Sequence, residues 1–306
     1  MRVFVTGATG FIGSAVVREL IDAGHRVVGL ARSDRAAASL TAAGAEAHRG
    51  DLANLDGLRD GATAADGVVH LAFTNLSATF TDYAAASQAD VRAISALGEG
   101  LIGTDRPFVV TSVTSLFAPG LVGVEDTPVS AAHPRTAPEE TALSFAAAGV
   151  RVSTVRLPPS VHGPGDKGFV PGLIGIARAK GVSAYVSEGA NRWPAVHRLD
   201  AARLYRLALE QAPAGARLHA VADEGVRFRD IAEAIGRLLD VPVKSIPLRE
   251  AEGHFAWLAR FASLDNPVSS ALTRRRLGWR PVHPGLLADL EEGHYAAGPA
   301  PAPAAD

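Results

Sequence analysis

Cysteine is absent from this chain of 306 residues. Its absence excludes disulfide bridges, thiolate metal sites and thiol nucleophiles, and it fits a reducing compartment. The histidines and carboxylates do not have the spacing of a metal site, so we expect no bound metal. A G-x-S-x-G nucleophile elbow is absent as well, which argues against a hydrolase.

Long hydrophobic runs and a strong net charge are also missing. No stretch of about 18 uninterrupted apolar residues occurs, so we expect no membrane span. The formal net charge of -2 gives no general attraction to nucleic acid or anionic lipid, and we expect a small-molecule partner instead. The N-terminus lacks the basic lead and the cleavage pattern of a signal peptide. The sequence predicts a cytoplasmic protein and leaves open whether it forms a homodimer.

The residues that are present suffice for a large core, since 47% are hydrophobic and 20% are charged. Five short runs are rich in β-forming residues, and a helical segment or a Gly/Pro turn follows each. They lie at residues 2–6, 25–30, 67–72, 107–112 and 150–157. Nearly continuous apolar runs are typical of strands that helices cover on both faces. We therefore predict an α/β protein with a Rossmann-like, doubly wound parallel sheet.

The pattern changes after residue 157, where Pro and Gly are frequent and mostly helical segments follow. We expect a dinucleotide-binding domain over residues 1–157 and a smaller, mainly substrate-binding lobe over 158–295. Segments within about 181–222 should return to the sheet, and the Ala/Pro-rich residues 296–306 should form a disordered tail. One apolar helix face, expected to pack in the core, consists of Ile231, Ala234, Ile235, Leu238 and Leu239.

Three glycines, Gly7, Gly10 and Gly13, follow the first strand with the spacing G-x-x-G-x-x-G and begin a helix. The first allows a tight turn, the second lets the backbone approach a pyrophosphate, and the third lets helix and strand pack closely. The pyrophosphate would then lie at the positive end of the helix. We expect the neighbouring residues of this turn to bind the dinucleotide too, namely Thr9, Phe11 and Ile12.

The end of the second strand bears on the choice of cofactor. Arg32 and Ser33 stand where an NAD-preferring site would place a carboxylate for the ribose hydroxyls. A guanidinium and a hydroxyl suit a 2'-phosphate, so NADP is the expected cofactor and NAD the alternative. Asp34 nearby keeps the NAD alternative open, with Arg32 as an ordinary surface residue.

Several motifs together are similar to a known family. "GATGFIG" is followed by "GDL" at residues 50–52 and "HLA" at 70–72, and later by "VVTSVTSLFAPG" and "VRLPPSVHGPGD". The chain resembles an extended short-chain dehydrogenase/reductase of the NAD-dependent epimerase/dehydratase family over residues 1 to about 210. The resemblance implies further cofactor contacts at the adenine, along the dinucleotide and at the nicotinamide. They are Asp51 and Leu52, then Leu71, Ala72 and Phe73, then Pro158, Val161 and His162.

Family members of this kind use a Tyr-x-x-x-Lys pair, in which tyrosine supplies a proton and lysine lowers its pKa. No tyrosine in this chain is followed by lysine four residues later. The pair should fall near Ala132 and Thr136, close to the stretch "HPRTAPEETALSF". The tyrosine's position is therefore vacant, and the resemblance does not identify the proton donor.

Other polar residues are candidates for this role. Ser112 and Thr114, in "TSVTS" on the predicted fifth strand, could orient a substrate carbonyl, although a hydroxyl is a poor acid near neutrality. His162 is our candidate proton donor because histidine titrates near working pH, and Tyr83 is the alternative. Arg135 would replace the lysine or form a surface salt bridge.

Structural roles are the expectation for the remaining polar residues of these motifs. For Glu139 and Glu140 we expect helix capping and solubility. For His70 we expect a structural hydrogen bond, and for Asp200 a helix cap.

These observations favour an NADP-dependent oxidoreductase that acts on a small carbonyl or enone with a non-standard proton donor. Reduction of an activated double bond is attractive because the final proton can come from water. Two alternatives stay open: a non-catalytic NADP-binding sensor, and a non-redox isomerase or cyclase on the same fold.

Overall fold

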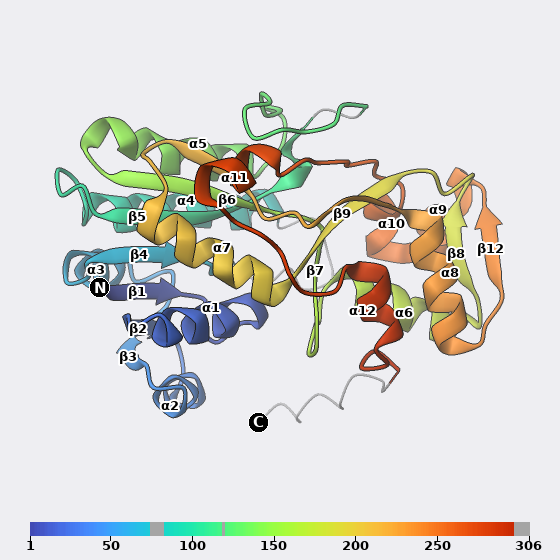
Figure 1. Cartoon of the computed structure of the whole chain (residues 1–306), viewed down its shortest axis with the longest axis horizontal. Helices are drawn as coiled ribbons and strands as arrows, with labels where there is room; N and C mark the ends of the chain where they lie inside the picture. The colour runs from blue at the N-terminus through green and yellow to red at the C-terminus, as the bar shows by residue number, and fades with distance from the viewer. Residues whose placement is uncertain (74–82, 118–119, 297–306) are drawn as a thin grey trace.

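The computed structural model of the chain describes residues 1–73, 83–117 and 120–296. Its centre is a seven-stranded parallel sheet in the order β10-β6-β5-β4-β1-β2-β3 (Figure 1). The strands are β1 (Arg2–Thr6), β2 (Arg26–Ala31), β3 (Glu46–Arg49), β4 (Gly67–His70), β5 (Pro107–Val113), β6 (Arg151–Leu157) and β10 (Ala216–His219). The strand order reverses between β1 and β4, where parallel sheets form a ligand-binding crevice at their carboxyl ends.

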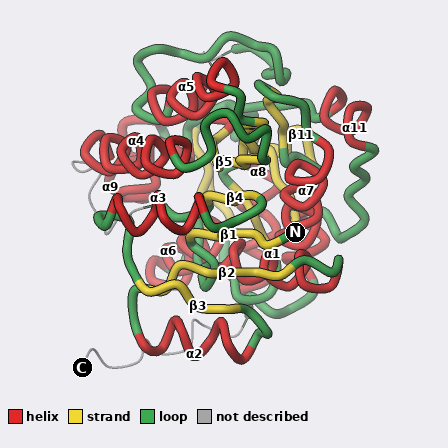
Figure 2. Tube along the Cα trace, turned by 90° about the vertical axis from the view of Figure 1, so that its left-hand side faces the viewer, coloured by secondary structure: helices red, strands yellow, loops and turns green. Residues whose placement is uncertain are grey.

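Helices cover both faces of the sheet (Figure 2). One face carries α3 (Leu55–Thr63), α4 (Tyr83–Glu99) and α5 (Thr136–Ser144), and the other carries α1 (Phe11–Asp22), α7 (Arg198–Gln211) and α11 (Ala271–Leu277), while α2 (Asp34–Ala42) lies beside the edge strand β3. Successive side chains of β1 enter different cores, because a strand alternates its faces. Val3 and Val5 pack with α1 and α7, whereas Phe4 packs with α3 and α4.

The C-terminal lobe lies beyond the carboxyl ends of the sheet (Figure 1). Its strands are β7 (Ser160–His162), β9 (Arg192–His197) and β11 (Asp223–Arg227) in one small sheet, and β8 (Ser183–Val186) with β12 (Val243–Ile246) in another. Its helices are α6 (Phe169–Lys180), α8 (Phe228–Leu239), α9 (Ala251–Phe255), α10 (Ala259–Ala262) and α12 (Leu286–Glu291). Trp193, Phe228 and Leu258 are buried at the centre of its separate core.

Short 3-10 turns link several of these elements. They are η2 (Thr114–Leu116), η3 (Phe145–Ala148), η4 (Leu248–Glu250) and η5 (Ala256–Leu258). The first of them continues directly from β5, so it carries the residues that leave the carboxyl end of that strand. In the described ranges, no helix combines the length and the apolar character that crossing a bilayer requires.

The predicted fold class is confirmed, because the structure has the Rossmann-like parallel sheet and a helical C-terminal region. The five predicted strands coincide with β1, β2, β4, β5 and β6 to within two residues at either end. Strand β3 escaped prediction because Glu46, His48 and Arg49 give it no apolar run at the exposed edge. The predicted helix face near residue 235 lies in the core within α8. Most of the expected tail, residues 297–306, lies outside the described residues.

The predicted capping role of Asp200 is wrong. The N-cap of α7 is His197, whose Nδ1 accepts a hydrogen bond of 3.3 Å from the main-chain N–H of Leu199. The buried carboxylate of Asp200 instead accepts hydrogen bonds from the main-chain N–H groups of Val282 and His283, each at 3.0 Å. Asp200 therefore fastens the segment between α11 and α12 to the start of α7.

Candidate active site

The glycine turn connects β1 to α1 at the point where the strand order reverses. A Cβ atom on Gly7, whose φ is +68°, would lie 2.7 Å from the main-chain nitrogen of Ala72. A Cβ atom on Gly13 would lie 2.0 Å from the carbonyl oxygen of Gly7, which also accepts a hydrogen bond of 2.9 Å from the main-chain N–H of Gly10. The backbone of this turn can approach its neighbours closely only with glycine at Gly7 and Gly13. These dimensions fit a cradle for a dinucleotide.

The first turn of α1 suits an anion. The helix begins after Gly10 without a side-chain cap and has no acidic residue in its first turn. Thr9 and Gly10 are exposed at this end, and Phe11 and Ile12 are half-buried. The guanidinium of Arg198, the first residue of α7, lies 5.1 Å from the centre of the Phe11 ring. The positive end of the helix and a nearby cation therefore act at one place.

Arg32 and Ser33 follow β2 at the same edge of the sheet, and both are exposed. Ser33 is the N-cap of α2, and its Oγ accepts a hydrogen bond of 3.2 Å from the main-chain N–H of Ala36. The Asp34 carboxylate forms an ion pair with Arg49 of β3. The carboxylate that kept the NAD alternative open thus has a cationic partner, while the Ser33 hydroxyl hydrogen can still be donated.

The other expected cofactor contacts also follow the carboxyl ends of parallel strands, so they share one edge with the glycine turn. Asp51 is exposed, and its Oδ1 accepts hydrogen bonds from the main-chain N–H groups of Ala53 and Asn54 at 2.9 and 3.1 Å. The N–H of Ala72 donates to Thr6 Oγ1 at 3.2 Å. The rest are half-buried or, for one proline, buried: Leu52, Leu71, Phe73, Val161 and Pro158.

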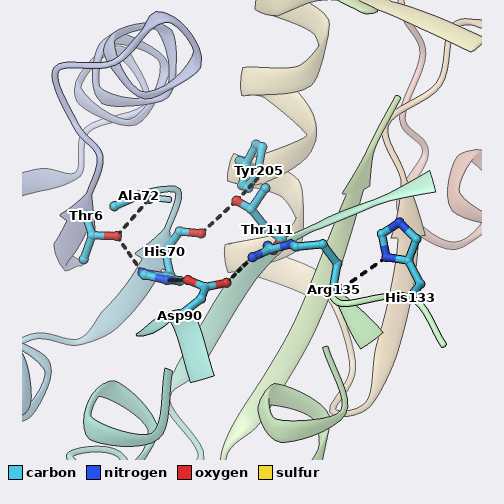
Figure 3. Close-up of polar contacts among 8 residues, drawn as sticks. All are labelled: Thr6, His70, Ala72, Asp90, Thr111, His133, Arg135 and Tyr205. Carbon is cyan, nitrogen blue, oxygen red and sulfur yellow. Dashed lines mark hydrogen bonds and ion pairs between the residues drawn. The ribbon is translucent and has the colours of Figure 1, made fainter. Parts of the chain in front are cut away.

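A buried chain of polar side chains lies under this edge (Figure 3). Thr6 Oγ1 lies 2.7 Å from His70 Nδ1, and His70 Nε2 lies 2.9 Å from Asp90 Oδ1. The other carboxylate oxygen of Asp90 forms an ion pair with the Arg135 guanidinium. Burial by itself would raise the pKa of Asp90, but the hydrogen bond and charge of His70, together with Arg135, hold that pKa below its ordinary value. The structural role expected for His70 is confirmed.

Arg135 occupies the region where the missing lysine was expected. One of its terminal nitrogens pairs with Asp90, and the other donates to the carbonyl oxygen of Thr111 at 3.0 Å. Its guanidinium lies 4.2 Å from the centre of the Phe73 ring. The side chain is buried, so the ion pair is not the surface salt bridge that was one of our two expectations. Arg135 therefore packs against the Phe73 ring. A catalytic role for Arg135 stays a prediction.

A second polar group gathers beyond the end of β5. Ser115 Oγ lies 3.3 Å from His133 Nε2, and both residues are half-buried. The Tyr83 ring stands edge-on to His133, at 6.1 Å between centroids, and also to Phe73, at 6.0 Å. Burial is the main reason why the pKa of Tyr83 is raised. This group continues the row of residues that begins at the glycine turn and Phe73.

The residues expected to perform catalysis are buried, and no side-chain hydrogen bond joins them to one another in the described part of the chain. Ser112 is buried, and its Oγ has no hydrogen-bond partner within the described residues. Thr114 is buried too, and its Oγ1 donates to Asn266 Oδ1 at 2.8 Å. His162 is fully buried, with Nδ1 2.9 Å from Asp289 Oδ2 in the lobe. Their catalytic roles stay predictions.

Glu139 is a correction. We expected a capping or solubilising residue, but its carboxylate is buried and accepts two hydrogen bonds from Arg156, at 2.9 and 2.5 Å. Arg156 also donates to the carbonyl oxygen of Glu125 at 3.1 Å. This bidentate pair joins α5 to β6 and holds the start of α5, together with Arg135 and His133, against the sheet. Glu140 is exposed, in agreement with the expectation.

Sequence reasoning missed Asp90 and Arg198. Asp90 lies on α4 at helical spacing from the buried residues Ala86, Ile94 and Leu97, so a carboxylate on an apolar helix face was the available signal. Arg198 gave no such signal, because only the fold brings the start of α7 to the glycine turn. Its Nε is buried without a hydrogen-bond partner among the residues that the structure describes.

Comparison with known proteins agrees with this geometry. A family model described as "NAD dependent epimerase/dehydratase family" matches residues 3–221, and the chain belongs to this family. The chain is 52% identical over 297 residues to an uncharacterized protein of Schizosaccharomyces pombe, covering 96% of this chain and 100% of the relative. It is 31% identical over 229 residues to the 2-alkyl-3-oxoalkanoate reductase of Stenotrophomonas maltophilia, covering 71% of this chain and 67% of the reductase.

The fold has close counterparts among solved structures. MoeE5 in complex with UDP-glucose and NAD superposes with a TM-score of 0.76 at 25% identity, covering 97% of this chain and 98% of that protein. A dTDP-glucose 4,6-dehydratase from Streptomyces venezuelae, with NAD and TYD bound, has a TM-score of 0.78 at 19% identity, covering 97% and 96%. The second likeness concerns the fold alone. The family and the glycine cradle together define a nucleotide-cofactor site.

Proposed function

We propose that the chain is an NADP-dependent oxidoreductase that reduces a small carbonyl compound or enone without a Tyr-x-x-x-Lys pair. In this proposal residues 1–157 bind the dinucleotide and residues 158–295 supply most substrate contacts. The cofactor, when bound, supplies hydride, and the protein orients it and excludes water. The observation that carries the proposal is a glycine cradle, closed to any larger side chain at Gly7 and Gly13, beside the exposed Arg32 and Ser33.

The choice of NADP rests on charge. Arg32 has no ion-pair partner among the described residues, whereas Asp34 is paired with Arg49. A guanidinium and a hydroxyl at the N-terminus of α2 are a good site for a 2'-phosphate. Arg198 lies instead by Phe11 in the first turn of α1, and we assign it to the diphosphate that both NADP and NAD share.

The choice of a carbonyl substrate has support from relatives as well as from chemistry. The bacterial relative named above is a reductase of 2-alkyl-3-oxoalkanoates. A relative from Stigmatella aurantiaca, 28% identical, is a ketoreductase. A ketone or enone brings its own hydride acceptor carbon and needs only a hydrogen-bond donor for its oxygen, and polar side chains lie near the carboxyl edge of the sheet.

One titration and one assay test the proposal. Fluorescence titration of the purified chain should give tighter binding of NADPH than of NADH. Arg32→Ala should weaken NADPH binding alone, and Arg26→Ala, at the opposite end of β2, is the matched control. Absorbance at 340 nm should then report NADPH oxidation with a panel of small ketones and enones.

The other outcomes identify the alternatives. Tight NADPH binding without turnover of any substrate would favour the sensor. Conversion of a substrate without net change at 340 nm would favour the isomerase or cyclase. Equal affinity for both cofactors would remove the role assigned to Arg32.

A further inference from the structure

Two polar side chains are held together just beyond β5, and the backbone fixes both. Ser115 lies in the turn η2, and His133 lies shortly before α5. The main-chain N–H of Ser130 donates to the carbonyl oxygen of Leu116 at 2.7 Å, which joins the two segments. The N–H of Thr136 donates to the carbonyl oxygen of His133 at 2.9 Å. The pair is therefore anchored at both ends by main-chain hydrogen bonds.

The hydrogen bonds define the tautomer of His133. The main-chain N–H of Arg135 donates to His133 Nδ1 at 3.2 Å, so a neutral ring carries its hydrogen on Nε2. That N–H faces Ser115 Oγ at 3.3 Å. A serine oxygen that accepts this hydrogen bond keeps its own hydroxyl hydrogen for another acceptor. The pair thus has one hydroxyl donor left to offer, with an imidazole N–H directly behind it.

The aromatic rings of Phe73 and Tyr83 lie between this pair and the glycine turn. Phe73 follows Ala72, the residue that a Cβ atom on Gly7 would strike. Tyr83 bridges Phe73 and His133 through edge-on ring contacts at 6.0 and 6.1 Å. The pair and the glycine cradle are thus the two ends of one row of contacts at the carboxyl edge of the sheet.

We infer that the Ser115 hydroxyl, whose oxygen accepts the His133 Nε2–H, is the donor that holds the substrate's carbonyl oxygen, in the place left vacant by the tyrosine. This inference rests on the proposed function and names Ser115 as its catalytic residue and His133 as the residue that positions the serine hydroxyl. As the carbonyl carbon accepts hydride, the C=O π electron pair moves to the oxygen. The oxygen takes a proton from water, which leaves hydroxide, and the hydrogen bond from the Ser115 hydroxyl stabilises the charge that develops there.

The electrostatic surroundings suit this role. Burial, followed by the positive charges of Arg260 and Arg135, lowers the pKa of His133 to about 4. The ring is therefore neutral at pH 7 and serves as a hydrogen-bond donor that gives up no charge. His162, the proton donor predicted from the sequence, is fully buried and hydrogen-bonded through Nδ1 to Asp289.

Kinetics of variants test the pair in the intact chain. With the ketone or enone that the 340 nm assay identifies, Ser115→Ala and His133→Ala should each lower kcat about 100-fold, the usual cost of losing one such donor. The NADPH dissociation constant should stay within about twofold, since the pair does not touch the cofactor cradle. His133→Gln retains an N–H donor and should recover part of the loss. Ser144→Ala on α5 and His254→Ala on α9 are matched controls that should retain full activity.

Two results would overturn the inference. If wild-type chain turns over substrate and both alanine variants retain kcat, the pair is structural and the proposed function still stands. If the wild-type chain shows no turnover, ¹⁵N spectra of the His133 ring with NADP⁺ and each ketone decide. Unchanged Nε2 resonances with every ketone would overturn the pair and the proposed function together. A shifted Nε2 resonance would support the pair as a carbonyl-binding site and remove only the redox step.

Discussion

The glycine turn after β1 and the polar group beyond β5, Ser115 with His133, lie at the same edge of the sheet, but different atoms build them. The turn presents main-chain groups, and glycine is required at Gly7 and Gly13 because a Cβ atom there would occupy the space of a neighbour. The polar group beyond β5 presents the side chains of Ser115 and His133. Buried charged residues lie next to it, with Asp90 between His70 and Arg135. A site built from main-chain groups keeps its function when the residues around its glycines are substituted. A site built from side chains changes its chemistry with each substitution.

The chain lacks a Tyr-x-x-x-Lys pair, but buried ion pairs still hold α5 against the sheet. Arg135 and Glu139 start α5 with two buried ion pairs, one to Asp90 and one to Arg156. These pairs hold α5 at the sheet without a lysine that contacts the cofactor. The position of His133 then follows from the start of the helix, because the N–H of Thr136 donates to the His133 carbonyl oxygen.

Removing the buried charge of Arg135, which pairs with Asp90, should have the largest effect on stability. Arg135→Ala leaves the Asp90 carboxylate buried without its cation, which should lower the free energy of unfolding by about 3–5 kcal/mol. Urea denaturation measures this change. The double variant Asp90→Asn, Arg135→Ala should recover part of the loss, and Arg229→Ala, in the exposed pair with Glu233, should leave the urea midpoint nearly unchanged because solvent screens that pair. A change in the free energy of unfolding well below this range in Arg135→Ala would show that the fold around α5 does not depend on the pair with Asp90.

Enlarging a glycine should break the turn by a steric effect. A Cβ atom on Gly13 meets the Gly7 carbonyl oxygen at 2.0 Å, so Gly13→Ala should cost about 3 kcal/mol of stability and abolish detectable NADPH binding. The control is Gly175→Ala in α6, where the added methyl meets nothing within 4 Å. That substitution should be neutral or stabilising by up to about 1 kcal/mol, because alanine favours helix. NADPH binding by Gly13→Ala at the wild-type affinity would contradict the cradle.

Cofactor affinities should separate two arginines at this edge. Loss of one charge-assisted contact costs roughly 1.5–2 kcal/mol, or about 10- to 30-fold in affinity. Arg32→Ala should show this loss for NADPH and none for NADH. Arg198→Ala should weaken both cofactors equally, because its guanidinium lies by Phe11 in the diphosphate turn. Calorimetric titration measures all four dissociation constants, and an equal loss for both cofactors in Arg32→Ala would place that side chain elsewhere.

The fold was predictable where one local pattern carries the signal. Apolar runs predicted the buried strands, and the glycine spacing predicted the turn at Gly7 to Gly13, whereas the polar edge strand β3 had no apolar run to reveal it. The side chains of the candidate site were harder to predict, because a polar residue in the sequence can be buried in a pair as well as exposed at the surface. Glu139 resembles a helix-capping residue in sequence but lies buried against Arg156, 17 positions away. Asp200 begins a helix yet binds the main chain of residues 282–283. Such long-range pairings exist only after folding.

Buried histidines make the stability of the chain sensitive to acid. Burial lowers the pKa of His133 and that of His197 to about 4, while an unfolded histidine titrates near 6.5. Between these values the unfolded chain binds the protons first, so stability falls as the pH decreases from about 6.5 to about 4. Each histidine should contribute about 1–2 kcal/mol of this loss by pH 5. Asp166, whose pKa burial raises to about 6, acts in the opposite direction and offsets part of it.

His197→Asn tests the acid sensitivity without removing the helix cap, because asparagine is a good N-cap residue. Urea midpoints at pH 7.5 and pH 5 should differ less in this variant than in the wild-type chain. Asp166→Asn should widen the difference, since it removes the opposing group. If both variants follow the wild-type pH dependence, His197 is accessible to protons in the folded state. Its ring packs 5.6 Å from that of His162, and that result would mean that this packing does not exclude water from the junction of sheet and lobe.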